Sequence, residues 1–229
     1  MNYSCDFLIA GGGAVGLTIA HQLLERNISN KIIILDKEDE LGLHSSGRNS
    51  GVIHAGIYYE PNSLKAKVCV SGAKRLKEWS IENGIKIKNC GKLIIPQKFD
   101  LDPQLDTLYA RGKKNGAVLD FIGPKDIEKL WPEANITTGR ALWSPNTSVI
   151  NPKKVINRLQ SNLKSKGIKI INSVNDFKLN KKNNELRLPN GSKIKYGYFI
   201  NSAGLQADKV AHKFNVGLDY RVIPFKGIY

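Results

Sequence analysis

The stretch CDFLIAGGGAVG, residues 5–16, decides the fold of this chain. Residues 6–10 form a short apolar segment that predicts a buried β-strand, and residues 14–26 show the apolar spacing of a helix. Between them Gly11, Gly13 and Gly16 follow the pattern Gly-x-Gly-x-x-Gly. The first glycine permits a tight turn, the second lets the backbone approach a pyrophosphate, and the third lets helix and strand pack closely. The helix N-terminus adds free N–H groups and partial positive charge for phosphates.

The segment KIIILD, residues 31–36, extends this motif along the chain. Its continuous apolar run is typical of a strand buried on both faces. Asp36 ends the run at 36 − 16 = 20 residues after the last glycine, where the motif requires an acid for the ribose hydroxyls. Residues 5–36 therefore predict one βαβ unit that binds a dinucleotide. The fingerprint by itself does not distinguish NAD from FAD.

The remaining pattern predicts further elements and a second domain. We expect helices over 64–83, 103–116, 124–130 and 152–167 and from 206, strands over 92–96, 141–144, 168–172 and 198–201, and a hairpin turn at 189–191. The predicted domains are residues 1–90 and 150–215 for the cofactor, and 91–149 and 216–229 for a second domain. Residues 221–229 indicate a strand that is only beginning, so we expect a truncated chain whose second domain continues further.

The charge and the cysteines limit the classes of function. The chain has 35 Lys and Arg against 20 Asp and Glu, a net charge of +15, but its lysines are scattered and no nucleic-acid-binding motif accompanies them. Two interpretations stay open, a solvated basic surface and attraction to an anionic cofactor, substrate or membrane. The three cysteines show no metal-ligand spacing, so we expect reduced thiols, no metal and no nucleic-acid partner. We expect a cytoplasmic protein, and leave open a peripheral contact with the inner face of the plasma membrane.

The loop SSGRNSG, residues 45–51, and the sequence after it carry a family resemblance. Residues 44–73, HSSGRNSGVIHAGIYYEPNSLKAKVCVSGA, resemble the L-2-hydroxyglutarate dehydrogenases and oxidases, within the D-amino-acid-oxidase-like (DAO) group of FAD enzymes. The resemblance continues through CGKLI at 90–94, 123–127, NSAGL at 201–205 and 221–227. The chain departs from the family in this loop. Where the family often has Gly-His-Asn, this chain has Gly47-Arg48-Asn49, so no role is carried over to the side chain of residue 48. Asp36 stands where glutamate is frequent, and its carboxylate can make the same hydrogen bonds.

This resemblance implies a fold and a cofactor. The fold is α/β, a Rossmann-like FAD-binding domain of the glutathione-reductase type interleaved with an α+β substrate domain whose mixed sheet covers the flavin. The ADP half of FAD is expected on the glycine turn and Asp36, and the pyrophosphate and flavin along 45–51. Val174 is expected beside the adenine, with simple strand packing as the alternative. The implied cofactor residues are Gly11, Gly13, Ala14, Val15, Gly16, Asp36, Lys37, Ser45, Ser46, Gly47, Asn49, Ser50, Gly51, Val174, Ala203 and Gly204.

His54 is the sharpest candidate for catalysis. Oxidation of a 2-hydroxy acid requires hydride transfer from carbon to flavin N5 and removal of the hydroxyl proton, and an imidazole suits the second task near neutral pH. A base and a substrate-binding residue remain alternative roles. Because the implied substrate is a dicarboxylate, it needs cationic or hydroxyl partners. The candidates are Tyr58, Tyr59, Lys65 and Lys226, each of which also fits ordinary packing or a surface position.

Three hypotheses follow. The first is FAD-dependent oxidation of L-2-hydroxyglutarate to 2-oxoglutarate, with electrons passed to a quinone or oxygen. The second keeps the DAO family and changes the substrate, to glycerol 3-phosphate or to an amine or amino acid. The third is a fragment that binds FAD without turnover.

Overall fold

The computed structural model describes residues 1–134, 136 and 138–225. It forms two compact units, one of residues 1–49 and 152–229 and one of residues 50–151. The sequence places residues 50–90 with the cofactor domain, whereas this division groups them with the second unit. The physical reason is strand pairing, because β3 (Val52–Ile53) and β4 (Ile87–Lys88) both pair with β8 (Ser148–Ile150). The predicted domain boundaries therefore remain a proposal.

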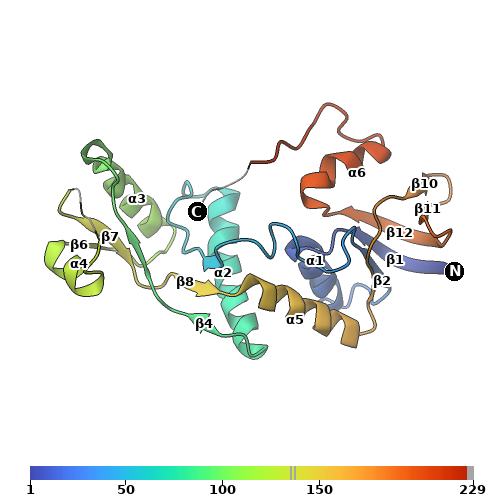
Figure 1. Cartoon of the computed structure of the whole chain (residues 1–229), viewed down its shortest axis with the longest axis horizontal. Helices are drawn as coiled ribbons and strands as arrows, with labels where there is room; N and C mark the ends of the chain where they lie inside the picture. Colours follow the sequence, from blue (N-terminus) through green and yellow to red (C-terminus); the bar gives the residue numbers. More distant parts are fainter. Residues whose placement is uncertain (135, 137, 226–229) are drawn as a thin grey trace. The chain divides into compact units, whose positions relative to one another are not determined.

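The first unit is built on a six-stranded sheet in the order β10-β11-β12-β1-β2-β9 (Figure 1). Its centre is parallel, with β1 (Asn2–Ala10) between β12 (Lys193–Asn201) and β2 (Ile32–Leu35), and with β9 (Lys169–Ile171) beyond β2. The chain passes from β1 to β2 through α1 (Ala14–Glu25), but β12 joins the other side of β1 only late in the sequence. The order in which strands are added to the sheet thus reverses at β1. Open parallel sheets bind ligands at such a switch point.

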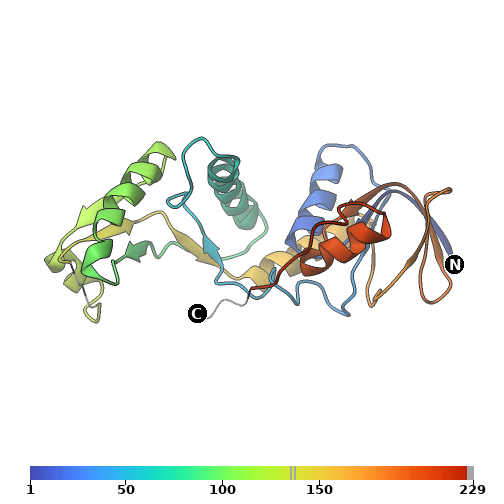
Figure 2. The ribbon, with the colours of Figure 1, turned by 90° about the horizontal axis from the view of Figure 1, so that it is seen from above.

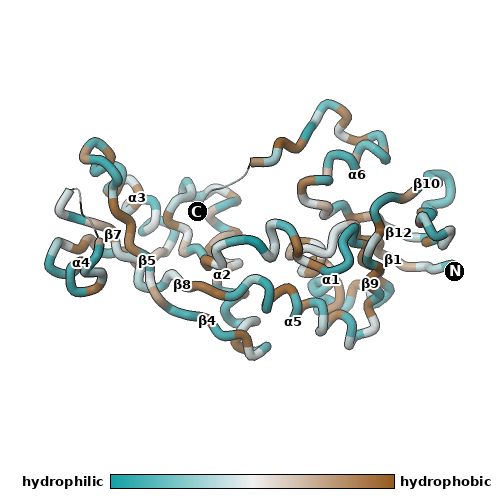
Figure 3. The backbone as a smooth tube through the Cα atoms, viewed as in Figure 1, coloured by the Kyte–Doolittle hydropathy of each residue, from teal (hydrophilic) through white to brown (hydrophobic). Residues whose placement is uncertain are grey.

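Both faces of the sheet are covered. On one face α1 packs on β1 and β2 and contacts α5 (Pro152–Ser165), and the side chains of Ile9, Leu17 and Ile34 are fully buried. On the other face Leu8, Ile33 and Ile194 belong to a core cluster that also contacts Val210 of α6 (Ala207–Lys213). Figure 3 shows hydrophobic residues along the central strands of this sheet. This double coverage is the reason that residues 31–36 are a continuous apolar run and not an alternating one.

An antiparallel extension completes the sheet. Strands β10 (Lys178–Asn180) and β11 (Glu185–Arg187) pair with each other, and β11 pairs with β12. The predicted turn at 189–191 connects β11 to β12, with Gly191 in the left-handed region at φ +82°. Figure 2 shows this extension at the same end of the unit as the N-terminus. The predicted strand at 198–201 is the second half of β12, whose first half pairs with β11.

The second unit contains two small antiparallel sheets, β3-β8-β4 and β5-β7-β6. Strand β7 (Ala141–Ser144) lies between β5 (Lys92–Ile94) and β6 (Asp120–Ile122), and Leu119 and Leu142 are fully buried. The helices are α2 (Leu64–Glu82), α3 (Pro103–Lys114) and α4 (Pro124–Leu130), with a 3₁₀ turn at Phe99–Leu101. In the first unit a second 3₁₀ turn, Gly204–Gln206, precedes α6.

A charged cluster ties α3 to the second of these sheets. The guanidinium of Arg140, just before β7, donates to both carboxylate oxygens of Asp102 and to Asp106 at 2.7 Å. These hydrogen bonds hold the pKa of the Asp102 carboxyl below its ordinary range. Among the described residues, no helix is long and apolar enough to cross a membrane.

Replacement of Ile34 tests the central strand. Ile34→Ala leaves a cavity in a fully buried site, so we expect the free energy of unfolding to fall by about 2–5 kcal/mol. The measurement is urea denaturation followed by circular dichroism. Ile28→Ala is the control, because that side chain is 55% exposed and its loss is expected to cost less than about 0.5 kcal/mol. Equal effects of the two substitutions would contradict the described packing.

Candidate functional site

A cavity of about 820 Å³ lies in the first unit at the carboxyl ends of β1, β2 and β12. Its volume is within the range of cofactor and ligand sites. It is lined by the glycine turn, by the end of β2, by the loop over 42–46, by 174–177 and by 202–213. The carboxyl ends of parallel strands at a point where the strand order reverses are the usual place of a ligand site in such sheets.

The glycine turn is pressed against the turn that follows β12. A Cβ at Gly11, whose φ is +105°, would overlap the carbonyl of Ser202, and a Cβ at Gly16 would overlap the carbonyl of Gly11. The Ser202 hydroxyl is a hydrogen-bond donor that lies 2.9 Å from the carbonyl oxygen of Ala10 and 3.0 Å from that of Gly11. The Ser202 N–H donates to Ala10 at 2.8 Å. The two turns therefore form one rigid edge of the cavity.

Ser46 lies at the N-terminus of α1. Its hydroxyl oxygen accepts a hydrogen bond from the Ala14 N–H at 3.0 Å. A hydroxyl that accepts in this way keeps its own proton to donate. Gly13 lies beside it, and a Cβ at Gly13 would come within 2.9 Å of the Ser46 oxygen. The helix end thus presents N–H dipoles and one hydroxyl donor in a space that a side chain would fill, an arrangement suited to phosphate oxygens.

The carboxylate of Asp36 is held by two backbone hydrogen bonds. One oxygen accepts from the Gly12 N–H at 2.7 Å and the other from the Glu38 N–H at 3.0 Å. An ionised carboxylate has about four acceptor positions, so both oxygens keep capacity for hydroxyl donors. The bonds fix Asp36 beside the glycine turn at the cavity wall.

These features fit the ADP half of FAD. The cavity is large enough, its edge excludes side chains at the glycines, α1 offers donors for a pyrophosphate, and Asp36 offers acceptors for a ribose. The fit rests on the donors and acceptors of this chain and on the space left by its glycines.

Most of the predicted cofactor residues line this cavity. Those on the wall are Gly11, Gly13, Asp36, Lys37, Ser45, Ser46, Val174, Ala203 and Gly204. Ala14, Val15, Gly16, Gly47 and Asn49 belong to the same unit without lining it, and Ser50 and Gly51 belong to the second unit. The Val174 N–H donates to the Asp36 carbonyl at 2.8 Å, so this donor serves the fold and a contact with adenine is left to the carbonyl.

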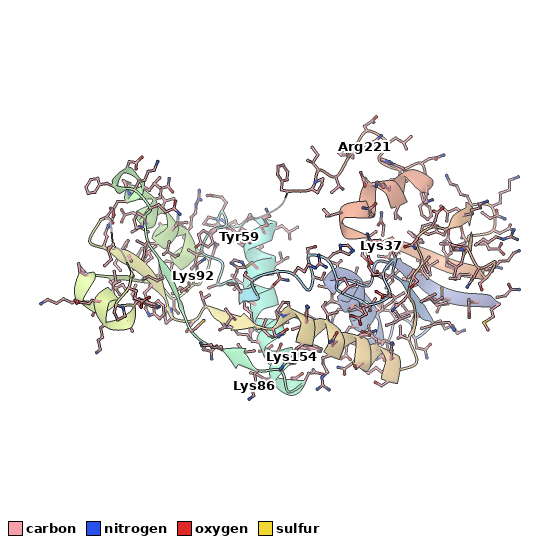
Figure 4. The ribbon with its side chains drawn as sticks, viewed as in Figure 1. Lys37, Tyr59, Lys86, Lys92, Lys154 and Arg221 are labelled. Carbon is pink, nitrogen blue, oxygen red and sulfur yellow. The ribbon has the colours of Figure 1, made fainter. Side chains whose placement is uncertain are left out.

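The sequence analysis assigned no role to several polar residues in and beside the cavity wall. His44 interacts with Glu38 through its Nε2 at 2.8 Å, and that contact lowers the pKa of the Glu38 carboxyl, with Lys37 adding to the effect. Lys213 pairs with Asp176 at 2.6 Å and lowers the pKa of that carboxyl. Ser202 was also missed, although it directly precedes the predicted Ala203. Figure 4 labels Lys37 at this site.

His54 lies in the second unit, one residue after β3. It lines a shallow depression with Tyr58, Tyr59, Lys92 and Thr147 and the backbone between residues 54 and 59. Burial lowers the pKa of the His54 imidazole, and the positive charge of Lys92 lowers it further. The thiol of Cys69 on α2 donates to the His54 carbonyl at 3.6 Å.

The structure brings three of the four predicted substrate residues together. Lys65 lies over the ring of Tyr59, with 5.9 Å from Nζ to the ring centroid, and Lys92 lies over the ring of Tyr58 at 4.5 Å. Figure 4 labels Tyr59 and Lys92 in this region. Lys226, the fourth, lies outside the described residues. The sequence pattern predicted Lys92 as the first residue of a strand and indicated no functional role for it.

No group of three or more His, Cys, Asp and Glu side chains suited to a metal ion is present in the part of the chain that the structure describes.

Comparison with known proteins identifies the family. Residues 6–229 match the sequence model described as DAO, FAD dependent oxidoreductase. The chain is 38% identical over 232 residues to L-2-hydroxyglutarate dehydrogenase, mitochondrial, of Caenorhabditis briggsae, covering 98% of this chain and 53% of that protein. The human protein of the same name is 35% identical over 240 residues, covering 99% of this chain and 51% of that protein. The chain thus spans about half the length of the curated relatives it matches.

Solved structures share the fold. Glycine oxidase from Geobacillus kaustophilus matches with a TM-score of 0.82 and 15% identity, covering 93% of this chain and 59% of that chain. FAD-bound L-alpha-glycerophosphate oxidase from Mycoplasma pneumoniae matches with a TM-score of 0.79 and 24% identity, covering 91% of this chain and 56% of that chain. Since the family match covers nearly the whole chain and the cavity fits the ADP half of the cofactor, the chain belongs to the DAO family of FAD dependent oxidoreductases.

Proposed function

We propose that the protein to which this chain belongs oxidises L-2-hydroxyglutarate to 2-oxoglutarate and passes the electrons to a quinone or oxygen. The observation that carries the proposal is the depression of the second unit, where an imidazole with a lowered pKa lies with Tyr58, Tyr59 and Lys92. Lys65 is outside its lining and approaches it through the ring of Tyr59. An imidazole and two cations match an α-hydroxyl group and two carboxylates. The names of the relatives give independent support.

Bound FAD supplies a hydride acceptor at flavin N5, and the chemistry of that step belongs to the cofactor. The chain contributes the residues that hold the ADP half. Asp36 would accept from the ribose hydroxyls, and the N-terminus of α1 and the Ser46 hydroxyl would donate to the pyrophosphate. The Val174 carbonyl would be the contact for the adenine. In the sequence, residues 45–51 connect the loop of this cavity to the segment that bears His54.

His54 takes the proton of the substrate hydroxyl. Its lowered pKa keeps the imidazole neutral, and therefore able to accept a proton, down to more acidic pH than an ordinary histidine. The groups around it are Lys92 on β5, the Cys69 thiol on α2 and the Tyr58 and Tyr59 hydroxyls of its own loop. Since the charge of Lys92 is positive, it favours the neutral form of the ring.

The tyrosines and lysines bind the carboxylates of the substrate. A lysine placed over an aromatic ring keeps donors on the side away from the ring, and those donors are free to bind an anion. Lys65 over Tyr59 supplies one such donor. The net charge of +15 favours the approach of a dianionic substrate.

The proposed location is the cytoplasm. The same positive charge supports a peripheral contact with the inner face of the plasma membrane.

The test of this function is the anaerobic visible spectrum of the full-length FAD-loaded protein. L-2-Hydroxyglutarate is expected to bleach the flavin absorbance, whereas D-2-hydroxyglutarate and glycerol 3-phosphate are expected to leave it unchanged. Bleaching by glycerol 3-phosphate alone would overturn the assignment in favour of the second hypothesis. A flavin that stays oxidised with every substrate would favour binding without turnover.

Substitution of Asp36 tests the ribose contact. Asp36→Asn replaces one acceptor oxygen by an NH₂ group, so we expect the Kd for FAD to rise by about 10- to 100-fold. The measurement is quenching of flavin fluorescence on titration into apoprotein. Asp39→Asn is the matched control, since Asp39 is an exposed acid in the same loop. An equal Kd for Asp36→Asn and the parent protein would show that the carboxylate does not bind the cofactor.

Substitution of His54 tests the base. His54→Gln is expected to lower kcat by about 10²- to 10⁴-fold while the spectrum of bound FAD stays the same. In the parent protein kcat/KM should rise with pH through an apparent pKa below the ordinary histidine value of 6.5, because burial and Lys92 both favour the neutral ring. His21→Gln on α1 is the control. A rate that falls as pH rises through this range would contradict the role of His54 as base.

A further inference from the structure

Lys92 opens β5, and its position is set by the sheet that follows. It pairs in register with Ser144 of β7, which is fully buried. The Ser144 hydroxyl is hydrogen-bonded at 2.9 Å to that of Thr147, and Thr147 lines the same depression as Lys92. The backbone of Lys92 thus belongs to a paired strand beside buried residues, although the side chain of Lys92 ends near the surface.

Among the described residues, the ammonium of Lys92 has an aromatic partner and no carboxylate partner. Its Nζ lies 4.5 Å from the centroid of the Tyr58 ring. None of the ion pairs between described residues includes Lys92, whereas Arg111 and Arg140 in the same unit both pair with carboxylates. A lysine held by a ring at the edge of a depression, with its donors uncommitted to protein carboxylates, is suited to an anionic ligand.

The ammonium also acts on His54 at a distance. Its positive charge is one of two causes that lower the pKa of the imidazole, the larger being burial. Lys92 and His54 line one depression, so they reach the same part of a bound ligand. The depression is too small to enclose a whole substrate, and what it offers is a rim with one base and one cation.

We propose that Lys92 binds the C1 carboxylate of the 2-hydroxy acid, the carboxylate attached to the carbon that is oxidised. This inference rests on the function proposed above and deepens it. The hydroxyl that His54 deprotonates and the C1 carboxylate are on adjacent carbons, so a base and a cation at one rim match these two groups. Lys65 over Tyr59 is left for the remote carboxylate. Lys92 thereby selects α-hydroxy acids over alcohols without an adjacent anion.

The test compares Lys92→Gln, Lys92→Arg and Lys86→Gln in the full-length FAD-loaded protein. Lys86 is an exposed lysine of the same unit and serves as the matched control. For Lys92→Gln we expect the KM for L-2-hydroxyglutarate to rise by about 10- to 100-fold, with a much smaller change in kcat. The inhibition constant of 2-oxopentanoate, a monocarboxylate that retains only the C1 carboxylate, should rise by a similar factor. Lys92→Arg should recover most of both losses.

The pH profile adds a measurement that a purely structural role would not change. Removal of the positive charge should move the acidic limb of kcat/KM to higher pH in Lys92→Gln and leave it in place in Lys92→Arg and Lys86→Gln. The flavin spectrum and the thermal unfolding midpoint of each variant establish that it is folded and loaded with FAD.

The outcomes separate the two proposals. If L-2-hydroxyglutarate fails to reduce the parent protein, the proposed function falls and the role of Lys92 falls with it. If the parent protein is reduced and Lys92→Gln keeps its KM, only the role of Lys92 is overturned. Loss of binding for L-2-hydroxyglutarate with unchanged inhibition by 2-oxopentanoate would refute the C1 assignment. Loss of folding in both Lys92 variants would show a structural role instead.

Discussion

The turn after β1 and the turn after β12 pass each other with no room for a side chain at Gly11 or Gly16. Ser202 joins them, because its hydroxyl and its N–H both donate to the end of β1. This close passage fixes where two parallel strands end and where α1 begins. The cavity, the free N–H groups of the helix and the position of Asp36 all depend on it. A larger residue at either glycine would force the turns apart and remove the common edge.

From this edge the cofactor site follows by short-range hydrogen bonding. Asp36 is oriented by backbone N–H groups of Gly12 and Glu38, and Ser46 is oriented by the first turn of α1. In each case a backbone donor uses part of the acceptor capacity of a side chain and leaves the rest for a ligand. Two charged residues of the wall have ionic partners, Lys37 with Glu38 at 3.3 Å and Lys213 with Asp176 at 2.6 Å. The features of the site that fit a dinucleotide are its hydrogen-bonding groups and its shape.

The second unit uses a different principle. Tyr58 and Tyr59 are adjacent in sequence, and the ring of each contacts a lysine from another element, Lys92 from β5 and Lys65 from α2. Aromatic rings fix the lysines without neutralising them, whereas a carboxylate would have consumed their charge. Lys92 therefore keeps its positive charge beside a histidine whose neutral form is favoured.

The sequence by itself determined the βαβ unit, Asp36 as its acid, the helices near 64–83 and 152–167 and the family, because these depend on local spacing and on continuous motifs. Most of the predicted cofactor residues proved to share one cavity for the same reason. Only the tertiary structure decided the partners of those motifs. Ser202 meets Gly11 because β12 pairs with β1. Lys92 meets Tyr58 in a unit where β5 pairs with β7, and β3, which precedes Tyr58, pairs with β8. Strand pairing between distant segments leaves no periodic signal in either segment, so neither contact was visible in the sequence.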